Sequence, residues 1–480
     1  MNKLATHPRS HRFKENTQAA MANPTLQTAL GKLKTGFSER RAQAVARLPE
    51  FDRLRDEATA IKNHSLNNLD FYLERYEEKA VAAGAKVHWC RDAAEARETI
   101  LRLCQNLQAK TVTKGKSMIT EEIGLNDFLQ SHGVLPIETD LGEYILQLRD
   151  EAPSHIVAPA IHVTKQEVAD LFLAAHQELP KDRPLDEART LIGEARTVLR
   201  QQFQTADVGI TGANFLIAET GSSVIVTNEG NGDLTQTLAK AHIVVASIEK
   251  VVPTLNDAAI LLRVLARSAS GQEFSSYTTF STGPRRGGDL DGPSEYHVVL
   301  LDNGRSAMLG TEFQDMLRCI RCGACMNHCP VYGTVGGHAY GWIYPGPMGA
   351  VLSPSLIGIK EAGHLPNAST FCGRCEQVCP VRIPLPKMMR HWRRREFEQH
   401  LAPVTMRWGL GLWSFVAQRP RLYHRLTQIF VALLRRLDRG RGRFRALPFA
   451  SAWTKGRDMP APEGSTFQAQ WAQRQKVPQP

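Results

Sequence analysis

The chain has 480 residues, 42% of them apolar and 22% charged, which is the composition of an ordinary soluble protein with room for two or three domains. The longest unbroken apolar run, Ile429 to Leu434, is far shorter than the roughly 20 residues that a membrane-spanning helix needs. The first 18 residues contain no apolar signal segment, so we expect a cytoplasmic protein. The net charge of +11 comes from one region, Lys387 to Arg445, where 15 Lys and Arg residues face three acids.

Residues 1–60 have a charged, helical pattern. The segment from His64 to Gly84 predicts an amphipathic helix, followed by a strand at 85–90 and a second helix at 91–106. Further short apolar runs then alternate with helical stretches: KTVTKGKSM, GVLPIETD, SHIVAPAI, VGITGANFLIAETGSSVIVT and HIVVASIEKVV. Alternation of this kind predicts an α/β domain with a largely parallel sheet over residues 61–305.

Residues 306–395 are rich in Cys, Gly and Pro and show little periodicity. We expect this segment to build little hydrophobic core and to be held by a metal centre. Within it, residues 331–359 contain no charged side chain, which predicts a loop packed on the protein. Residues 396–480 form a basic helical region that ends in a loose tail of about thirty residues. One amphipathic helix there is marked by Leu426, Ile429, Phe430, Leu433, Leu434 and Leu437.

Seven of the nine cysteines fall into two runs, and the other two, Cys90 and Cys104, are expected to be buried or bystander thiols. The first run has the spacing C-x2-C-x2-C-x3-C-P and consists of Cys319, Cys322, Cys325 and Cys329. The second run ends in the same way and consists of Cys372, Cys375 and Cys379, with Ser369 where a first cysteine would stand. Clustering of this kind in a reducing compartment indicates metal binding.

This spacing is that of proteins with two iron–sulfur clusters, in which the cysteine before proline ligates the cluster of the other run. The rule predicts two [4Fe–4S] clusters. The first takes Cys319, Cys322, Cys325 and Cys379. The second takes Cys329, Cys372 and Cys375, and one of its irons lacks a cysteine. Ser369, a hydroxide or water, or a residue from elsewhere could complete it, or the centre is [3Fe–4S].

Structural zinc is the competing interpretation of the C-x2-C pairs. The first run, however, has one cysteine too many for half a zinc site, and both runs end in Cys-Pro, so iron–sulfur is favoured. His328, inside the first run, is interpreted as a loop residue rather than as a hydrogen-bond donor to a cluster. An open iron that polarises a hydroxy acid is a further, less favoured hypothesis.

Two other groups of residues in the α/β region are candidate sites. The acids Glu121, Glu122, Glu138, Asp140 and Glu143 could include a nucleophile or base, but we favour helix starts for the first two and surface positions for the others. A turn-rich loop could offer backbone N–H groups to an anion, or be only a turn; it contains Gly221, Asn228, Gly230, Asn231 and Gly232. No G-x-G-x-x-G fingerprint or P-loop supports a nicotinamide or ATP site.

Several segments resemble the lactate-utilisation iron–sulfur family, the B-type subunit of the bacterial L-lactate oxidation system. In the α/β region they are KSMITEEIGLNDFL, ETDLGEYILQL, PSHIVAPAIH and GITGANFLIAETGSSVIVTNEGNGDL. In the later regions they are CPVYGTVGGHAYGWIYPGPMGAVLSP and RWGLGLWSFVAQRPRL, together with the serine in the second run. The resemblance implies a lactate-utilisation domain similar to the ribose-phosphate isomerase and CoA-transferase group, joined to a ferredoxin-like two-cluster domain and a helical C-terminal segment.

The resemblance also implies a function, namely electron transfer while L-lactate is oxidised to pyruvate. The implied partners are a cysteine-rich subunit and a small subunit that shares the α/β domain. The chain would then be a non-catalytic component of the complex. In the alternative, the α/β domain is itself catalytic on a hydroxy acid or on a CoA or sugar-phosphate compound. A subunit of glycolate oxidase or heterodisulfide reductase type is disfavoured, because no cysteine follows Cys379.

The basic C-terminal helix has three interpretations. It could dock an acidic partner subunit, lie on the inner face of an anionic membrane, or simply be solvated. Docking is favoured. Nucleic acid is not expected as a partner, because no recognition signature accompanies the basic residues.

Overall fold

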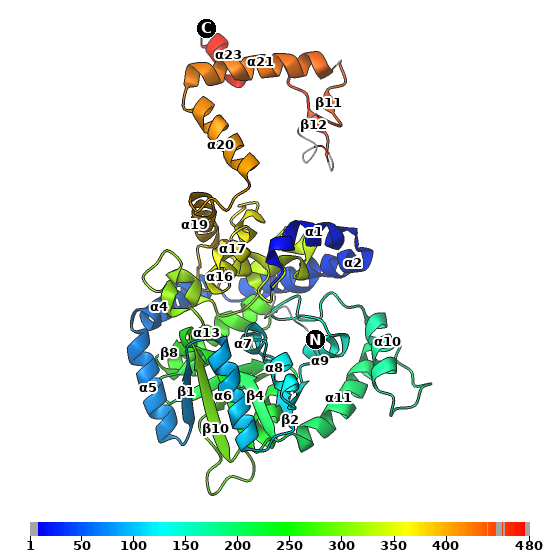
Figure 1. The fold of residues 1–480 in the computed structure, drawn as a ribbon, viewed down its shortest axis with the longest axis vertical. Helices are drawn as coiled ribbons and strands as arrows, with labels where there is room; N and C mark the ends of the chain where they lie inside the picture. Colours follow the sequence, from blue (N-terminus) through cyan, green and yellow to red (C-terminus); the bar gives the residue numbers. More distant parts are fainter. Residues whose placement is uncertain (1–7, 439, 448–453, 455–456, 476–480) are drawn as a thin grey trace. The chain divides into compact units, whose positions relative to one another are not determined.

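The computed structural model describes residues 8–438, 440–447, 454 and 457–475 (Figure 1). The chain forms two compact units, Met1–Glu398 and Gln399–Pro480, each described by itself below. The finer division expected from the sequence, with boundaries after residues 60, 305 and 395, stays a prediction.

A six-stranded parallel sheet is the centre of the first unit, as the strand–helix alternation predicts. Its strands, in spatial order, are β1 (Lys86–Cys90), β10 (Glu295–Leu301), β7 (Ala241–Ser247), β4 (Val208–Gly212), β2 (Thr111–Lys114) and β3 (Leu135–Glu138). All five pairings are parallel. Every residue of β7 is buried, as expected of a central strand with both faces covered.

Helices cover both faces of this sheet. On one face α6 (Ala93–Asn106) and α8 (Leu125–Ser131) share an apolar core with the strands, and this core includes Cys90 and Cys104. On the other face α5 (Leu69–Ala82) packs through Leu73 and Tyr76 against β7 and β10. Both isolated cysteines are therefore buried away from the cysteine runs, as predicted.

A second, four-stranded sheet was not foreseen as a separate sheet. It runs in the order β8 (Val251–Val252), β5 (Phe215–Ile217), β6 (Ser222–Thr227) and β9 (Tyr277–Ser281), and it mixes parallel and antiparallel pairs. The long apolar run at 208–227 therefore folds into three strands. Gly221, at φ 71°, makes the turn between β5 and β6, and a side chain there would collide with the backbone of Ala80.

Two expectations about local structure in this region are wrong. The helix expected from His64 to Gly84 is two helices, α4 (Phe51–Asn67) and α5, because Asn68 leaves the helical conformation between them. The apolar run SHIVAPAI forms no strand and is a largely buried loop. There His155 Nδ1 accepts the backbone N–H groups of Val157 and Ala158 at 3.0 Å each, which supplies hydrogen bonds that a strand would otherwise provide.

The cysteine-rich segment was expected to build little hydrophobic core, and this is wrong. It contributes to the largest apolar core of the first unit, together with α4 and α13 (Leu255–Ala269). The charge-free stretch at 331–359 contains a helix, α16 (Gly346–Leu356), rather than only a loop, and residues 346–354 are all buried. Pro347 lies in its first turn, where proline is tolerated, whereas Pro354 lies inside the helix, two residues before its end.

The remaining elements of the first unit complete this core and the α/β domain. The α-helices are α1 (Phe13–Ala22), α2 (Pro24–Leu33), α3 (Glu39–Ala46), α7 (Met118–Glu122), α9 (Leu141–Arg149), α10 (Lys165–Ala175), α11 (Ala188–Thr205), α12 (Asn231–Leu238), α14 (Ala324–Asn327), α15 (Tyr332–Val335), α17 (Ile359–Ala362), α18 (Arg374–Gln377) and α19 (Leu385–Glu398). Short 3-10 and π helices are η1 (Ser10–Arg12), η2 (Lys34–Ser38), η3 (Ile248–Lys250), η4 (Ser306–Met308), η5 (Gln314–Arg318), η6 (His338–Tyr340) and η7 (Leu365–Asn367).

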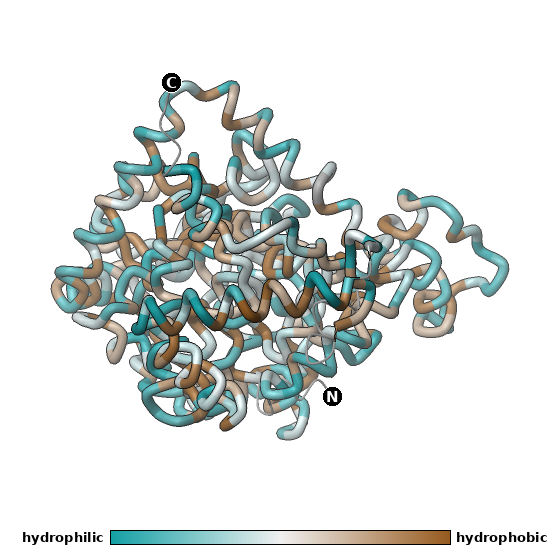
Figure 2. The backbone as a smooth tube through the Cα atoms, turned by 90° about the horizontal axis from the view of Figure 1, so that it is seen from above, coloured by the Kyte–Doolittle hydropathy of each residue, from teal (hydrophilic) through white to brown (hydrophobic). Residues whose placement is uncertain are grey.

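The second unit is built on α20 (Val404–Ala417) and α21 (Pro420–Asp438), followed by β11 (Arg443–Phe444), β12 (Met459–Pro460) and α23 (Phe467–Arg474). The helix predicted from the leucine repeat is present as α21, but only Leu434 of that repeat is buried. Apolar and polar residues alternate along the helices of the chain, as amphipathic helices require (Figure 2). Within the described ranges, no helix has both the length and the apolar character needed to cross a membrane.

Candidate metal centre and adjoining cavity

The two cysteine runs have the same local backbone geometry. In each, a left-handed glycine begins a short helix: Gly323 (φ 74°) precedes α14, and Gly373 (φ 78°) precedes α18. Two residues earlier, Arg321 and Phe371 also have positive φ, 59° and 53°. Non-glycine residues rarely adopt this conformation. The matched geometry indicates that both loops are shaped for the same task.

The thiols form two electrostatic groups, and each group draws on both runs. The first contains Cys319, Cys322, Cys325 and Cys379. The second contains Cys329, Cys372 and Cys375. Cys325 also lies within electrostatic reach of Cys375, so the two groups are neighbours.

The donor set fits an iron–sulfur centre. Burial raises the pKa of Cys375 to about 12 and raises that of Cys325 well above its usual value, so these thiols would ionise only beside a cation. Cys329 Sγ accepts the N–H of Tyr332 at 3.5 Å. Cys379 Sγ accepts the N–H of Ile383 at 3.4 Å. Hydrogen bonds of this kind support cluster sulfurs.

The second group opens toward solvent. Cys372 is the exposed thiol of the seven, and the backbone N–H of Arg374 and the hydroxyl of Thr370 lower its pKa. Ser369 is half-buried three residues before Cys372, as Cys319 is before Cys322, and its Oγ accepts the N–H of Phe371 at 3.1 Å. Thr370 was missed by the sequence reasoning, because a lone threonine carries no motif.

Arginines from the N-terminal helices hold the second run in place. Arg55 donates to the carbonyls of Gln377 (2.7 Å) and Cys379 (3.1 and 2.8 Å). Arg41 donates to the carbonyl of Val378 at 3.0 Å. In the first run, His328 Nδ1 pairs with the backbone carbonyl of Ala324 at 2.9 Å, an arrangement that suits a loop residue.

A buried ion network joins the α/β domain to the first cysteine run. Arg305 is fully buried and contacts Glu122 through two nitrogens at 2.9 and 2.7 Å. Its Nε lies 3.1 Å from Glu249, whose other oxygen lies 3.6 Å from Arg321. Burial alone would raise the pKa of Glu249, but Arg305 and Arg321 lower it to about 2. Tyr344 donates to Glu122 at 2.7 Å.

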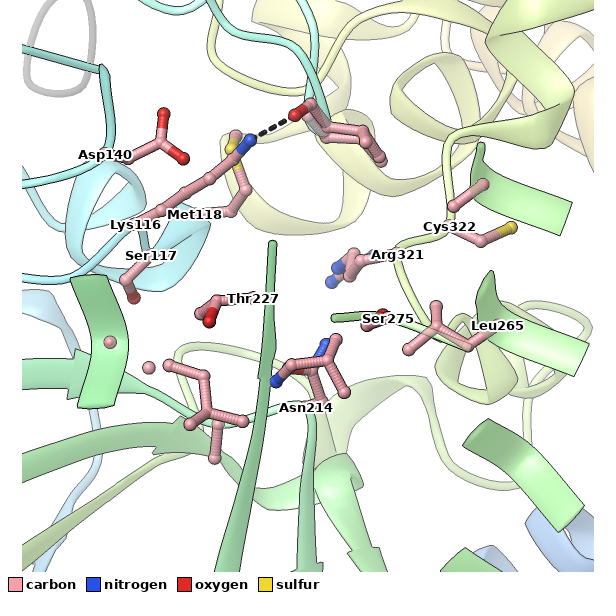
Figure 3. Close-up of a pocket in the computed structure, with 18 of the residues that line it drawn as sticks. Lys116, Ser117, Met118, Asp140, Asn214, Thr227, Leu265, Ser275, Arg321 and Cys322 are labelled. Atoms are coloured by element: carbon pink, nitrogen blue, oxygen red, sulfur yellow. Dashed lines mark hydrogen bonds between the residues drawn. The ribbon is translucent and has the colours of Figure 1, made fainter. Parts of the chain in front are cut away.

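A cavity of about 280 Å³ lies between the α/β domain and the first cysteine run. Arg321 points into it, whereas the sulfur of the next residue, Cys322, points to the other side of the loop (Figure 3). Lys116 and Asp140 lie at the opposite end of the cavity, and the ammonium of Lys116 donates to the carbonyl of Val157 (Figure 3). One wall of this cavity is therefore the loop that carries a candidate cluster ligand.

The residues of the candidate anion-binding loop lie in two different places in the structure. Asn228, Asn231 and Gly232 line the cavity, and Gly230, at φ 70°, immediately precedes α12. Gly221 belongs elsewhere, because it packs against α5.

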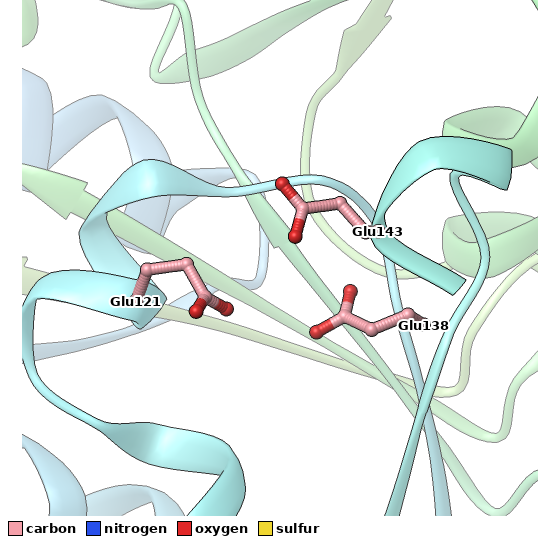
Figure 4. A group of neighbouring side chains, drawn as sticks. All are labelled: Glu121, Glu138 and Glu143. Atoms are coloured by element: carbon pink, nitrogen blue, oxygen red, sulfur yellow. The ribbon is translucent and has the colours of Figure 1, made fainter. Parts of the chain in front are cut away.

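The expected surface position of the acids is wrong for Glu138 and Glu143, which are 2% and 4% exposed. These two and Glu121 present oxygens within 4.8 Å of one another, as a divalent cation would require (Figure 4). The Lys114 ammonium, however, already lies 2.7 Å from both Glu121 and Glu138. Asp140 caps α9, with its carboxylate accepting two backbone N–H groups.

Replacing Glu143 by glutamine is expected to stabilise the protein increasingly as pH rises. Burial raises the pKa of Glu143 well above its usual value, and Glu121 and Glu138 raise it further against the opposing charges of Lys116 and Lys114. The folded state therefore keeps a proton that the unfolded state loses above about pH 4.5, so the wild-type free energy of unfolding falls as pH rises from there. Thermal unfolding at pH 5 and pH 8 measures the difference.

Glu98→Gln, at an exposed position on α6, is the matched control and should shift the unfolding temperature equally little at both pH values. If Glu143→Gln behaves like this control, Glu143 is ionised in the folded protein.

Sequence reasoning also missed Lys250, Arg305 and Arg321 as site residues. Arg321 lies inside the first cysteine run, which is a local signal, whereas the partners of Arg305 are distant in sequence. Lys250 ends η3, three residues beyond β7. Its position shortly after a buried apolar strand is the sequence feature that could have indicated it.

Comparison with known proteins agrees with both parts of this description. A model of the LUD domain matches residues 73–301, and a model of the 4Fe-4S dicluster domain matches residues 315–383. The fold and the thiol groups therefore define an iron–sulfur protein in which a LUD domain is joined to a dicluster domain.

Lactate utilization protein B of Bacillus velezensis is 42% identical over 472 residues, covering 97% of each chain. The "Uncharacterized electron transport protein YkgF" of Escherichia coli is 40% identical over 464 residues, covering 96% of this chain and 97% of its own. The chain belongs to the lactate utilization protein B family. The solved structure of a DUF162 family protein from Deinococcus radiodurans covers 48% of this chain and 98% of its own, with 14% identity and a TM-score of 0.28.

Proposed function

We propose that this chain is an iron–sulfur electron-transfer subunit in the oxidation of L-lactate to pyruvate. The observation that carries the proposal is the crossed grouping of seven thiols, in which Cys379 joins the first run and Cys329 joins the second. That grouping follows the ligation pattern of proteins with two [4Fe–4S] clusters. The relatives' names, which refer to lactate utilization and electron transport, support the substrate and the role.

In this proposal each thiol group holds one [4Fe–4S] cluster. The first cluster takes Cys319, Cys322, Cys325 and Cys379. The second takes Cys329, Cys372 and Cys375, and Ser369, a hydroxide or water, or another residue completes it, unless it is a [3Fe–4S] centre. The position of Ser369 three residues before Cys372, matching that of Cys319 in the first run, supports the serine.

The two thiol groups differ in exposure, which supports electron transfer between the interior of the protein and its surface. The first group lies beside the internal cavity, while the second includes the exposed Cys372. When bound, the clusters would accept and donate single electrons, which does not by itself oxidise a carbon substrate. We therefore propose that turnover requires the partner subunits. The internal cavity favours the alternative, in which the α/β domain is itself catalytic.

The second unit offers a surface for such partners, namely the cysteine-rich subunit and the small α/β subunit. Helix α20 has no buried residue, and Trp408, Leu412 and Trp413 on it are 77%, 68% and 63% exposed. Exposed apolar surface of this extent marks interaction sites. An anionic membrane surface on the inner face would suit the same helices, and vesicle flotation distinguishes it from subunit docking.

Anaerobic purification of the full chain tests the proposal. We expect iron and sulfide without zinc, two dithionite-reducible EPR signals, and no L-lactate-dependent dye reduction until the two partner subunits are added. Zinc in place of iron would overturn the redox role. Dye reduction by the chain alone would instead establish the catalytic alternative.

A further inference from the structure

The cavity beside the first cysteine run is placed where α/β proteins bind ligands. Strands β4 and β7 end at Gly212 and Ser247, and both residues line the cavity. Ser117, three residues beyond the end of β2, lines it as well. Crevices at the carboxyl ends of parallel strands are the usual ligand sites of open α/β sheets. Here the dicluster segment closes that crevice from the other side.

The wall next to the cysteine run carries two cationic side chains, Lys250 and Arg321, with Glu249 and Cys319 within electrostatic reach of both. Lys250 lines the cavity, and among the described residues its ammonium has no hydrogen bond and no ion pair. Arg321 points into the same space, and its ion pair with Glu249 is long, at 3.6 Å (Figure 3). Glu249 is already paired with Arg305 at 3.1 Å. A half-buried ammonium without a hydrogen-bonded partner can make a charge-assisted hydrogen bond to a ligand, so this wall suits an anion.

Neutral hydrogen-bonding groups face the same space. The hydroxyl oxygen of Thr227 is buried without a partner. Asn214 accepts the N–H of Val226 through its side-chain oxygen at 3.0 Å, which leaves its amide N–H groups as donors. Asn231 and Gly232, in the first turn of α12, add the positive end of a helix dipole. These groups can hydrogen-bond a carboxylate and an adjacent hydroxyl or carbonyl oxygen.

The size of the cavity and its opposite end narrow the class of ligand. A volume of about 280 Å³ is at the lower limit of the pockets that hold drug-sized molecules, so a small ligand fits better than a coenzyme. Asp140 and Glu229 lie among the lining residues. Two carboxylates in the lining disfavour a multiply charged phosphate, while they can accept a hydrogen bond from an alcohol.

We propose that this cavity binds a small 2-hydroxy or 2-oxo monocarboxylate, with its carboxylate against Lys250 and Arg321 and its neighbouring oxygen near Thr227 and Asn214. The inference rests on the proposed function and adds to it, because it places the substrate or product of the reaction in this chain, beside the loop that carries Cys322. Binding needs no partner subunit, whereas turnover does.

The test is ligand binding to the full chain with its iron–sulfur centres in place, measured anaerobically by calorimetry with L-lactate, pyruvate and inorganic phosphate. We expect saturable binding of L-lactate or pyruvate and weaker binding of phosphate. Lys250→Gln should weaken the monocarboxylate roughly 10- to 100-fold, the usual loss for a charge-assisted hydrogen bond. Thr227→Val should weaken it less.

Lys240→Gln is the matched control. Lys240 immediately precedes β7, its side chain is 73% exposed, and it pairs with Asp207 at 3.3 Å, so binding should be unchanged. Iron content and dithionite-reduced EPR spectra of each variant show whether the centres are intact.

Three outcomes would overturn the inference: no saturable binding by protein with intact centres, tighter binding of phosphate than of either monocarboxylate, or equal binding by Lys250→Gln and wild type. A chain that lacks iron would instead count against the proposed function, so the two failures are distinguishable.

Discussion

Replacing Cys379 by alanine is expected to remove the iron–sulfur centre of the first cysteine run and to leave that of its own run in place. The reason is the crossed grouping, in which, besides burial, Cys379 raises the pKa of Cys322 and of Cys325, whereas Cys372 raises that of Cys329 and Cys329 raises that of Cys375. Anaerobically purified Cys379→Ala should lose about half of its iron. The EPR spectrum of the dithionite-reduced variant should retain only the signal of the second centre.

The reciprocal variant makes the experiment decisive. Cys329→Ala should lose the second centre and keep the first, and Cys90→Ala, which removes a buried thiol outside both runs, should lose no iron. If Cys379→Ala and Cys372→Ala remove the same signal, each run holds its own centre. The crossed ligation is then wrong, even though both centres are present.

The sequence was enough to propose a ligand pattern, because the information is local; the ligation itself stays a prediction. Cysteine spacing of two and three residues, with proline after the last, restricts the loop geometry before any tertiary contact is known. The parallel sheet could also be predicted from local information, since the apolar run of β7 at 241–247 is a strand buried on both faces. Where the pattern was ambiguous, the expectation failed. Gly and Pro at 331–359 indicated a loop, yet burial of every residue from 346 to 354 stabilises α16.

The electrostatics of the site could not be predicted in the same way, because the partners lie far apart in sequence. Glu138 and Glu143 were expected at the surface, since glutamate is rarely buried without a partner. Lys114, the partner of Glu138, comes from a neighbouring strand, and only the pairing of β2 with β3 brings the two side chains together. Glu122 and Arg305 are 183 residues apart, so no local pattern connects them.

Replacing Arg305 by methionine is expected to destabilise the first unit by about 3–5 kcal/mol, the usual cost of removing one partner from a buried ion pair. Arg305 is fully buried, and its removal leaves the carboxylates of Glu122 and Glu249 without their main cation. Urea unfolding of the anaerobic protein measures this loss. The control is Arg91→Gln, whose pair with Glu95 is at the surface, so this variant should change the stability little.

The same variant tests whether the ion network supports the iron–sulfur site. Glu249 has two arginine partners, Arg305 and Arg321, and only Arg321 remains when Arg305 is replaced. Arg321 should then be drawn toward the Glu249 carboxylate, and the loop before Cys322 should shift. The first centre should then lose iron faster than the second when a chelator is added. Adding Glu122→Gln to Arg305→Met removes one of the two stranded charges and should restore part of the stability. Equal loss from both centres would show that Arg305 stabilises the fold without positioning the first cysteine run.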